Sequence, residues 1–380
     1  MSKKLAIIGA SYLQEPLINK AKEKGLETHV FAWECGDIGE IIADYFYPIS
    51  IVEKETILKK CREIGIDGIC TIASDLAAIT VGFVAENMCL IGNPMSAVEV
   101  STNKHLMREC FEKNGDPSPK SIKVTGIKDV ENIKLDYPVI VKPVDRSGSR
   151  GVTKLDGPQG LDDAIKDAIE QGFDKSALIE EFAQGEEYSV EYISWKGKHS
   201  FLAMTQKYTT GAPHFIETAH MEPANISSKC IENVKSIVEH ALDSLGIVYG
   251  ASHSELKIDS NGNVKIIEIG GRMGGDNIGS SLIPLSTGFD FVGAVVDIAI
   301  GREPQIEIEK RGYAGIRFLF SNDDLKVLED IKENSADILR EEMINSFSDR
   351  IVTDSSSRYG YYVFSSEHEE DVKKYMPKPN

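Results

Sequence analysis

The chain lacks the features of secreted, membrane-spanning and zinc-binding proteins. None of its apolar runs approaches the ~18 residues that a membrane-spanning helix requires. The apolar run after the first two lysines is short and leads into a polar helix pattern, so we interpret it as a buried strand rather than a signal peptide. The six cysteines are scattered and form no CxxC pair, which favours reduced thiols in a cytoplasmic protein.

An excess of positive charge is also lacking. The sequence has 60 Asp and Glu against 42 Lys and Arg, which gives a formal net charge of −18. Such a surface repels nucleic acid and anionic membranes, so neither is an expected partner. A small anionic substrate stays compatible with this charge, because it needs only a local basic pocket.

Two common nucleotide-binding motifs are missing as well. No GxxxxGK[ST] stretch occurs, which excludes the P-loop mode of phosphate binding. After the first apolar run, the segment GASYLQE offers Gly9 alone, where a dinucleotide-binding fold needs three glycines. A nicotinamide-dependent enzyme is therefore not expected.

The 380 residues are enough for two or three domains with cores of their own. Strand and helix patterns alternate over the first 95 residues, which predicts a parallel sheet covered by helices. A helix is expected to be capped near Ser101 and to end at Gly115, and the Pro-rich DPSPKS that follows indicates a domain boundary. We predict an α/β protein with an N-terminal domain (1–95), a connecting helix and linker (96–118), a small lobe (119–187), a large lobe (188–300) and a C-terminal α+β subdomain (301–380).

The segment SELKIDSNGNVKIIEIGGRMGGD, residues 254–276, places an Asn-Gly pair between two runs of strand-forming residues. Asn-Gly favours a two-residue hairpin loop, since both loop residues need a positive φ. With that loop, Glu255 and Glu268 face each other on one side of the sheet. Like charges about 5 Å apart repel by on the order of 3 kcal/mol, so a cation is expected between them. The alternative is a pair of side chains splayed into solvent.

A second candidate site follows the strand pattern YPVIVKP, which carries Lys142. The loop SGSRG, residues 147–151, comes directly after it. Glycines let backbone N–H groups approach phosphate oxygens, and Lys142 would add a point charge to the same phosphates. A flexible hairpin turn beside a solvated lysine explains these residues equally well.

The third piece is ALIEEFAQGEEYSVEYI, residues 177–193. A linker between two domains could present backbone groups to an adenine edge, and Glu187 could accept hydrogen bonds from ribose hydroxyls. Taken alone, an exposed acidic hairpin is the simpler interpretation.

The order of these pieces resembles the ATP-grasp superfamily of carboxylate–amine ligases. The matching motifs are NKHLMRECFEKNGDPSP, PVIVKPVDRSGSRGV, IEEFAQGEEYSVE and ELKID…IEIGGRMGGD, and the resemblance covers most of the chain. It implies the ATP-grasp fold, with an N-terminal pre-ATP-grasp domain, a lid lobe and a large lobe that clasp ATP, and a small C-terminal subdomain. The EIGGR variant looks most like the branch of L-amino-acid ligases and dipeptide synthetases.

The resemblance also implies roles for particular residues. Glu255 and Glu268 match the Mg²⁺ ligands, where Mn²⁺ can substitute, and Arg272 matches the arginine near the transferred phosphoryl group, with Lys142 as a second catalytic cation. The implied nucleotide contacts are Lys104, Lys142, Ser147, Gly148, Ser149, Gly151, Glu180, Glu181, Phe182, Glu187, Leu256 and Ile267. Gly270 replaces an asparagine that usually helps the metal, so water or another oxygen is expected to substitute there.

Substrate contacts are less readily predicted. The segment TTGAPHFIETAHMEP, residues 209–223, resembles the one that lines the acceptor pocket of amino-acid ligases. Glu217 could hold a substrate ammonium, and His214 or His220 could contact a carboxylate; a surface loop with two solvated histidines explains the segment as well. Further polar candidates are Asp75, Asp276 and Asn277.

The expected function is an ATP-dependent carboxylate–amine ligase that forms an amide or peptide bond through an acyl phosphate, with an amino acid as substrate. One alternative is a purine-pathway or carboxylating ATP-grasp enzyme that activates formate or bicarbonate. The other is a non-catalytic nucleotide-binding regulator. Small molecules are the expected partners, and the family predicts a homodimer.

Overall fold

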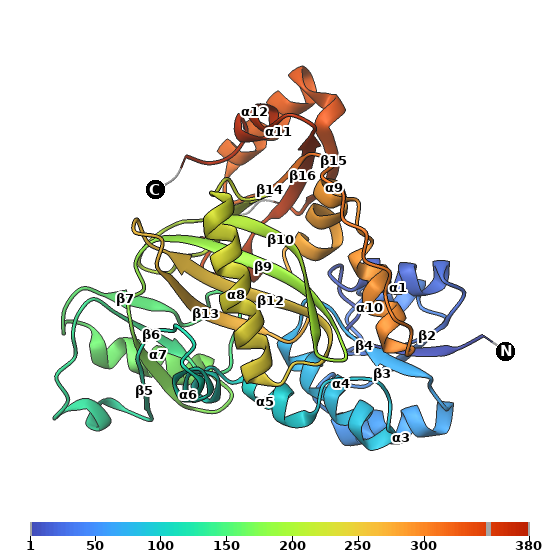
Figure 1. Cartoon of the computed structure of the whole chain (residues 1–380), viewed down its shortest axis with the longest axis horizontal. Helices are drawn as coiled ribbons and strands as arrows, with labels where there is room; N and C mark the ends of the chain where they lie inside the picture. The colour runs from blue at the N-terminus through green and yellow to red at the C-terminus, as the bar shows by residue number, and fades with distance from the viewer. Residues whose placement is uncertain (1, 347–350, 379–380) are drawn as a thin grey trace.

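The computed structural model describes residues 2–346 and 351–378, and within these ranges the strands form three sheets (Figure 1). The first sheet is parallel, with the strand order β3-β2-β1-β4. Its strands are β1 (Lys4–Ile8), β2 (Glu27–Ala32), β3 (Tyr45–Pro48) and β4 (Gly68–Cys70), and its helices are α1 (Glu15–Glu23), α2 (Ile38–Ile42), α3 (Lys54–Ile64) and α4 (Asp75–Met88). Leu5 and Ile7 enter one core and Ala6 and Ile8 another, as expected for a strand covered on both faces.

Two helices, not one, connect this sheet to the rest of the chain. They are α5 (Met95–Thr102) and α6 (Lys104–Asn114). The predicted cap near Ser101 is wrong, because the Asn103 side chain caps α6 by accepting from the N–H groups of His105 and Leu106 at 3.0 and 3.2 Å. Gly115 ends α6 with a φ of 79°, as predicted.

The small lobe contains the second sheet, which is antiparallel with the order β5-β8-β6-β7. Its elements are β5 (Ser121–Val124), the 3-10 helix η1 (Ile127–Val130), β6 (Val139–Pro143), β7 (Thr153–Leu155), α7 (Leu161–Gln171) and β8 (Ala177–Glu181). Ile165 of α7 packs against Val141 and Ile179 of the sheet.

The third sheet has eight antiparallel strands in the order β13-β12-β9-β10-β11-β14-β16-β15. They are β9 (Glu186–Trp195), β10 (Lys198–Thr209), β11 (Glu217–Glu222), β12 (Tyr249–Ile258), β13 (Val264–Gly270), β14 (Tyr313–Phe318), β15 (Leu339–Ile344) and β16 (Gly360–Ser366). Strands from the last seventy residues therefore continue the same sheet as the large lobe. The remaining elements are α8 (Ser228–Leu245), η2 (Ile278–Leu282), α9 (Ile283–Thr287), α10 (Phe291–Ala299), α11 (Asn322–Asn334), η3 (Ala336–Ile338), η4 (Ser355–Ser357) and α12 (Glu369–Lys373).

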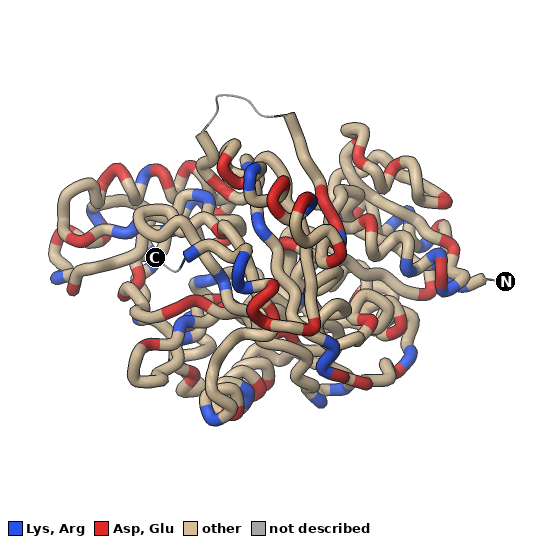
Figure 2. Tube along the Cα trace, turned by 90° about the horizontal axis from the view of Figure 1, so that it is seen from above, with Lys and Arg blue, Asp and Glu red and all other residues tan. Residues whose placement is uncertain are grey.

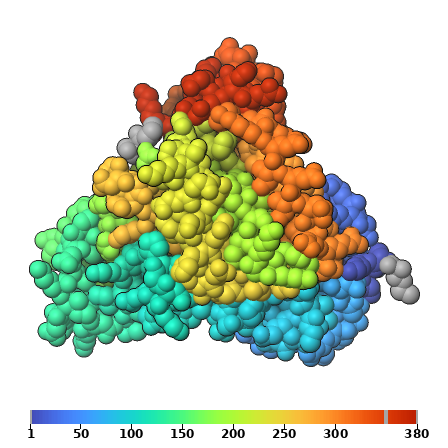
Figure 3. Space-filling model, viewed as in Figure 1, coloured from blue at the N-terminus to red at the C-terminus, as the bar shows by residue number. Residues whose placement is uncertain are grey.

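Helix α8 covers one face of the large sheet, on the side turned to the viewer in Figures 1 and 3. Val238 and Leu242 of this helix pack in one core with Tyr192 of β9 and Leu256 of β12. Since side chains alternate along a strand, the residues between them face the other way. That opposite face carries a row of polar side chains, which are Glu187, Ser189, Glu191, Thr205, Lys207, His220, Glu222, His253 and Glu255.

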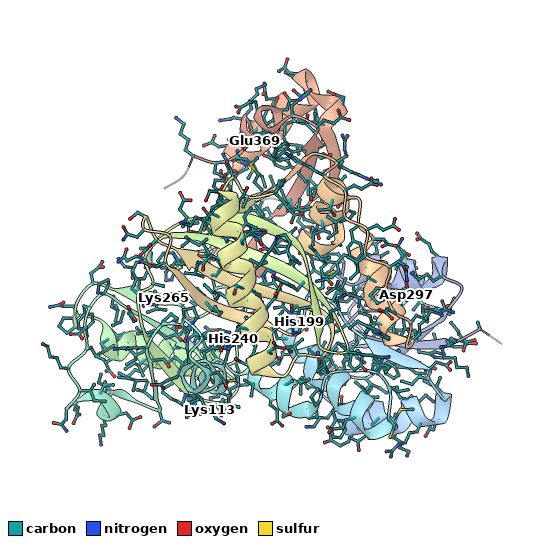
Figure 4. The ribbon with its side chains drawn as sticks, in the orientation of Figure 1. Lys113, His199, His240, Lys265, Asp297 and Glu369 are labelled. Atoms are coloured by element: carbon teal, nitrogen blue, oxygen red, sulfur yellow. The ribbon has the colours of Figure 1, made fainter. Side chains whose placement is uncertain are left out.

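Ion pairs connect the large sheet and the helices α8 and α10 to neighbouring parts of the chain, and Figure 4 labels one partner of each. Asp297 of α10 pairs with Lys24 at 2.7 Å, Lys265 of β13 with Glu181 at 2.5 Å, and His240 of α8 with Asp116 at 2.7 Å. Elsewhere acidic and basic residues are interspersed along the trace (Figure 2). None of the helices in the described ranges has both the length and the apolar character needed to span a membrane.

Candidate nucleotide and metal site

A cavity of about 160 Å³ lies between the small lobe and the polar face of the large sheet. Most of the predicted nucleotide, metal and catalytic residues line it: Lys104, Lys142, Ser147, Gly148, Ser149, Glu180, Glu181, Phe182, Glu187, Glu255, Ile267, Glu268 and Arg272. Two predicted nucleotide contacts lie elsewhere. Gly151 sits at the base of its loop, beside Pro143 and Gln171, and Leu256 is fully buried in the core under α8.

The hairpin that carries both glutamates differs from the predicted one. Its loop is closed by Asp259, whose N–H donates to the Asn263 carbonyl at 3.0 Å, so the loop holds three residues rather than two. Gly262 takes a positive φ of 83° and Asn261 does not. The predicted two-residue loop is therefore wrong.

The facing of Glu255 and Glu268 is nevertheless as predicted, because a second irregularity cancels the first. Leu256 pairs with Ile266, but Glu255 pairs with Glu268, which leaves Ile267 as an extra residue in β13. This β-bulge shifts the register by one residue and returns both carboxylates to the same face.

Two lysines lie against the facing glutamates. Lys207 Nζ is 2.6 Å from Glu255 Oε1, and Lys104 Nζ is 2.8 Å from Glu268 Oε1. His253 lies between Glu255, at 3.4 Å, and the buried Glu191, to which its Nδ1 is hydrogen-bonded. Although burial opposes ionisation, the charge of Lys207 and then that of His253 hold the pKa of Glu255 well below its ordinary value. The alternative of glutamates splayed into solvent is wrong.

Lys142 and Glu180 form a buried ion pair beneath the glycine loop. The Lys142 Nζ is 2.6 Å from Glu180, and Arg108 approaches the same carboxylate at 2.9 Å. Lys142 is 5% exposed and Glu180 3%, so the interpretation as a solvated lysine is wrong. The acidic segment is not a hairpin, because β8 and β9 belong to different sheets, although Glu181 and Glu186 in it are exposed. Burial lowers the pKa of Lys142, against the charge of Glu180. Arg108 was not predicted, although it follows Lys104 by four residues on one face of α6.

Aromatic rings mark one end of the cavity. Phe182 and Phe215 lie 6.0 Å apart between ring centroids, and the Lys257 ammonium lies 5.5 Å from the Phe182 centroid. The glycine loop is attached nearby, since Ser149 Oγ donates to the Phe215 carbonyl at 3.1 Å. Such an end can take a flat, electron-rich base.

Arg272 also lines this cavity and is held by Asp75. Two nitrogens of the guanidinium donate to the two Asp75 oxygens at 2.7 and 2.9 Å. Asp75 is the first residue of α4, whose cap Ser74 accepts from the Ala77 N–H at 3.2 Å. Asp75 thus positions an arginine in this structure, although it was predicted as a substrate contact.

A second cavity of about 390 Å³ adjoins the first and shares Lys104, Arg146, Ser147, Gly148 and Glu268 with it. Asp276 lines it and pairs with Arg358 of the C-terminal strand region at 2.5 Å and with His220 at 3.4 Å. Arg358 was not predicted, because it lies 82 residues from its partner in the sequence.

The other predicted substrate residues are dispersed. Glu217 lines the first cavity and accepts from Ser355 Oγ at 2.7 Å. His220 is 1% exposed within β11, so the interpretation of this segment as a surface loop is wrong there. His214 is exposed, with Nδ1 3.0 Å from the Val152 carbonyl, and the buried Asn277 lines neither of the two cavities.

The donor set fits a hard divalent cation that arrives with a nucleotide. Among the described residues, no group of three or more His, Cys, Asp or Glu side chains could hold a metal on its own. Two facing carboxylates, with Lys104 and Lys207 ready to contact phosphate oxygens instead, match the way Mg²⁺ binds through one or two carboxylates plus phosphates.

Comparisons with known proteins agree with this geometry. Residues 135–280 match the model of the ATP-grasp domain family. The chain is 27% identical to alanine–anticapsin ligase of Bacillus subtilis (strain 168), over 59% of this chain and 52% of that protein. It is also 27% identical to D-alanine–D-alanine ligase of Hydrogenovibrio crunogenus, over 47% of this chain and 58% of that protein. The chain thus spans about half the length of the curated relatives it matches.

Among solved structures, L-amino acid ligase from Bacillus licheniformis superposes with a TM-score of 0.84 at 24% identity, covering 98% of this chain and 96% of that one. That likeness concerns the fold, including the parallel sheet, the small lobe and the large antiparallel sheet. Residues 135–280 thus carry an ATP-grasp domain, and the chain as a whole has a fold similar to that of this ligase.

Proposed function

We propose that the protein is an ATP-dependent ligase that joins the carboxylate of an amino acid to an amine. The observation that carries the proposal is the pair of facing glutamates, with Lys104, Lys142 and Arg272 around one cavity that opens into a second. The ligases named above, which include amino acid ligases, support the choice of reaction. The second cavity offers room for a carboxylate and an amine beside the nucleotide.

In the proposed reaction the substrate carboxylate attacks the γ-phosphorus of ATP, which gives an acyl phosphate and releases ADP. The amine then attacks the acyl carbon, an amide forms, phosphate leaves and the amine loses a proton. Arg272, fixed by Asp75, stabilises the negative charge that spreads over the transferred group, while Lys104 and Lys142 hold phosphate oxygens. The glycine loop excludes water, which would otherwise hydrolyse the acyl phosphate.

Glu255 and Glu268 would hold Mg²⁺, which neutralises phosphate charge when bound. The proposal extends to the residues around the base and ribose: Phe182 and Ile267 pack against the base, and Glu187 accepts from ribose hydroxyls. The location is proposed to be the cytoplasm, where the six thiols stay reduced. A homodimer and the five-segment domain division also stay proposals.

Hydroxylamine trapping tests the reaction. The protein is incubated with Mg-ATP, hydroxylamine and a pool of L-amino acids, and both hydroxamate and ADP are measured. We expect hydroxamate that depends on the amino acids, since hydroxylamine attacks an acyl phosphate. ADP release that responds only to bicarbonate or formate would favour a carboxylating or formate-activating enzyme, and no response to any of these would favour a regulator.

The variants Glu255→Gln and Glu268→Gln test the site within the same assay. Each keeps the shape of the side chain but removes a charge from the metal position, so we expect ADP release to fall by on the order of 100-fold or more. Exposed Glu55→Gln is the matched control and should retain activity. Full activity with an unchanged magnesium requirement in both site variants would reject the assignment.

A further inference from the structure

Two of the cations that line the second cavity, Arg146 and Arg150, have no carboxylate partner among the described residues. The carboxylates of the cavity already have partners: Asp75 pairs with Arg272, Asp276 with Arg358, and Glu268 with Lys104. Arg146 and Arg150, from the glycine loop, also line the cavity. In the part of the chain that the structure describes, neither has a carboxylate within ion-pair distance, and Arg146 Nε is buried without a hydrogen-bond partner.

The nearest acidic side chains are engaged elsewhere. Asp145 accepts from the N–H groups of Phe173 and Asp174 at 3.0 and 2.7 Å. Asp354 interacts electrostatically with both arginines, but its Oδ1 already accepts hydrogen bonds from the N–H and the hydroxyl of Ser356 at 2.8 and 2.6 Å. Burial and then the charge of Arg150 lower the pKa of Arg146, as expected for two guanidinium groups that face one region without an anion between them.

The two arginines are placed differently with respect to the nucleotide cavity. Arg146 lines both cavities, with its guanidinium stacked on the Phe173 ring at 4.6 Å and its carbonyl accepting from Lys104 Nζ at 2.8 Å. Arg150 lines only the second cavity. A guanidinium binds a carboxylate through two parallel hydrogen bonds, so Arg150 suits an anion that is not part of the nucleotide.

We propose that Arg150, with Arg146 beside it, binds the carboxylate of the amine substrate, so that the second substrate is an amino acid rather than ammonia or a simple amine. This inference rests on the proposed function. The acid that is activated must lie at the border of the two cavities, because Glu268 lines both of them and Arg272 of the first cavity is paired with Asp75 of the second. In an α-amino acid the carboxylate is two bonds from the attacking nitrogen, so it lies deeper in the second cavity, where the unpartnered Arg150 stands.

Hydroxylamine separates this role from a role in holding phosphates. It attacks the same acyl phosphate as the amine substrate but carries no carboxylate, so its reaction should not need Arg150. The experiment uses the acid that gives hydroxamate in the pooled screen. Hydroxylamine, a pool of L-amino acids and a pool of their primary carboxamides are offered as amines, and products containing that acid are measured by mass spectrometry.

In the unmodified protein we expect amino acids to be used in strong preference to their carboxamides. Arg150→Met should reduce kcat/KM for amino acids by about 10- to 100-fold, in line with the loss of hydrogen bonds to a charged group. Hydroxamate formation and the KM for ATP should stay within about twofold, Arg150→Lys should recover part of the loss, and the exposed Arg302→Met should behave as the unmodified protein.

Each other outcome overturns the inference in a recognisable way. Equal losses with hydroxylamine and amino acids would assign Arg150 to the phosphates or to loop folding. An unchanged preference for amino acids over carboxamides in Arg150→Met would show that the carboxylate is bound elsewhere. If the unmodified protein makes no hydroxamate at all, the proposed function fails first and the inference falls with it.

Discussion

Glu222 is a carboxyl group of the polar face whose pKa is changed by burial. It is fully buried at the end of β11, where the hydroxyls of Thr205 and Ser286 donate to its two oxygens at 2.7 and 2.5 Å. Burial raises its pKa from the ordinary 4.5 to about 7, and the charge of Glu191 adds to the effect. Folding therefore makes this carboxyl group hold its proton more tightly.

The raised pKa predicts that stability falls as the pH rises. Below about pH 4.5 Glu222 is protonated in both the folded and the unfolded chain. From there to about pH 7 the unfolded chain releases the proton while the folded chain keeps it, so the free energy of unfolding decreases with pH. We expect Glu222 to account for a loss on the order of 1–3 kcal/mol across this window.

Urea denaturation of Glu222→Gln at several pH values between about 5 and 8 measures this effect. The amide cannot ionise, so the variant should lose the part of the pH slope that Glu222 contributes and should gain relative stability at the alkaline end. Exposed Glu55→Gln should run parallel to the unmodified protein. If the curve of Glu222→Gln is also parallel, Glu222 does not change its protonation on folding in this range.

The identity of the charged residues could be predicted at this scale, but their partners could not. Lys142 was recognised from its strand and the glycine loop, whereas its pairing with Glu180 was not, and the same carboxylate also contacts Arg108, 72 residues away. Lys207 carried no motif, and its place beside Glu255 follows from the pairing of β9 with β10 and β12. Buried ion pairs arise from tertiary contacts that local sequence does not encode.

The hairpin of β12 and β13 shows the same limit for elements. Turn chemistry predicted a loop at Asn261-Gly262, and a glycine with positive φ is found there, yet the loop is one residue longer. Glu255 pairs with Glu268 only because of the bulge at Ile267. The Ile267 carbonyl accepts from Arg108 at 2.5 Å, and the Ile266 N–H donates to the Pro117 carbonyl at 2.7 Å. Residues outside the hairpin thus form hydrogen bonds to its backbone at the bulge, and the hairpin sequence alone does not predict these bonds.

Deletion of Ile267 tests the importance of that register. Without the extra residue, Glu268 follows Ile266 directly and still pairs with Glu255 in a regular ladder, so we expect the facing carboxylates, and with them the proposed ligase activity, to be retained. Gly262→Ala, in the same hairpin, should cost about 1 kcal/mol of stability for a left-handed residue but retain activity. Both variants should therefore stay active; a folded deletion variant without activity would contradict the assignment of Ile267 as the extra residue.

A similar limit applies to α5, which was predicted as part of a connection. Its sequence MSAVEVST is rich in β-branched residues and follows Pro94, so local preference for a helix is weak. In the structure Val98 lies so close to Gly82 of α4 that a Cβ there would come within 2.8 Å of it. Close packing against α4 decides the conformation of this segment, and sequence patterns alone do not predict such packing.

On the scale of the whole molecule, the second cavity is assembled from every part of the chain. Tyr12 from the N-terminal sheet stacks on Tyr361 of β16 at 6.1 Å, and Asp276 from the large lobe meets Arg358 beside them. The order of motifs predicted the fold and most of the residues that line the first cavity, because those motifs are local. The contribution of residues 351–361 was not predicted, since it depends on β16 returning to the large sheet.

The Arg358–Asp276 ion pair connects the C-terminal part of the chain to the second cavity, and its contribution to stability can be measured. Arg358 is 8% exposed, lies 3.6 Å from the Phe318 ring centroid, and donates to both Asp276 oxygens. Arg358→Met would leave the Asp276 carboxylate, largely buried in the wall of the second cavity, with only His220 as an ion-pair partner among the described residues. We expect the free energy of unfolding in urea to fall by about 3–5 kcal/mol, as when one partner of a buried pair is removed.

The double variant Asp276→Asn with Arg358→Met removes both charges, so it should be clearly more stable than the sum of the single changes predicts. The exposed pair Lys332–Glu342, at 2.5 Å in the same C-terminal region, is the matched control, and its coupling should stay below about 1 kcal/mol. Additive losses for Asp276 and Arg358 would mean that solvent reaches this pair. The C-terminal strands would then cover the cavity without closing it from water, and the shelter of the acyl phosphate would depend on the glycine loop alone.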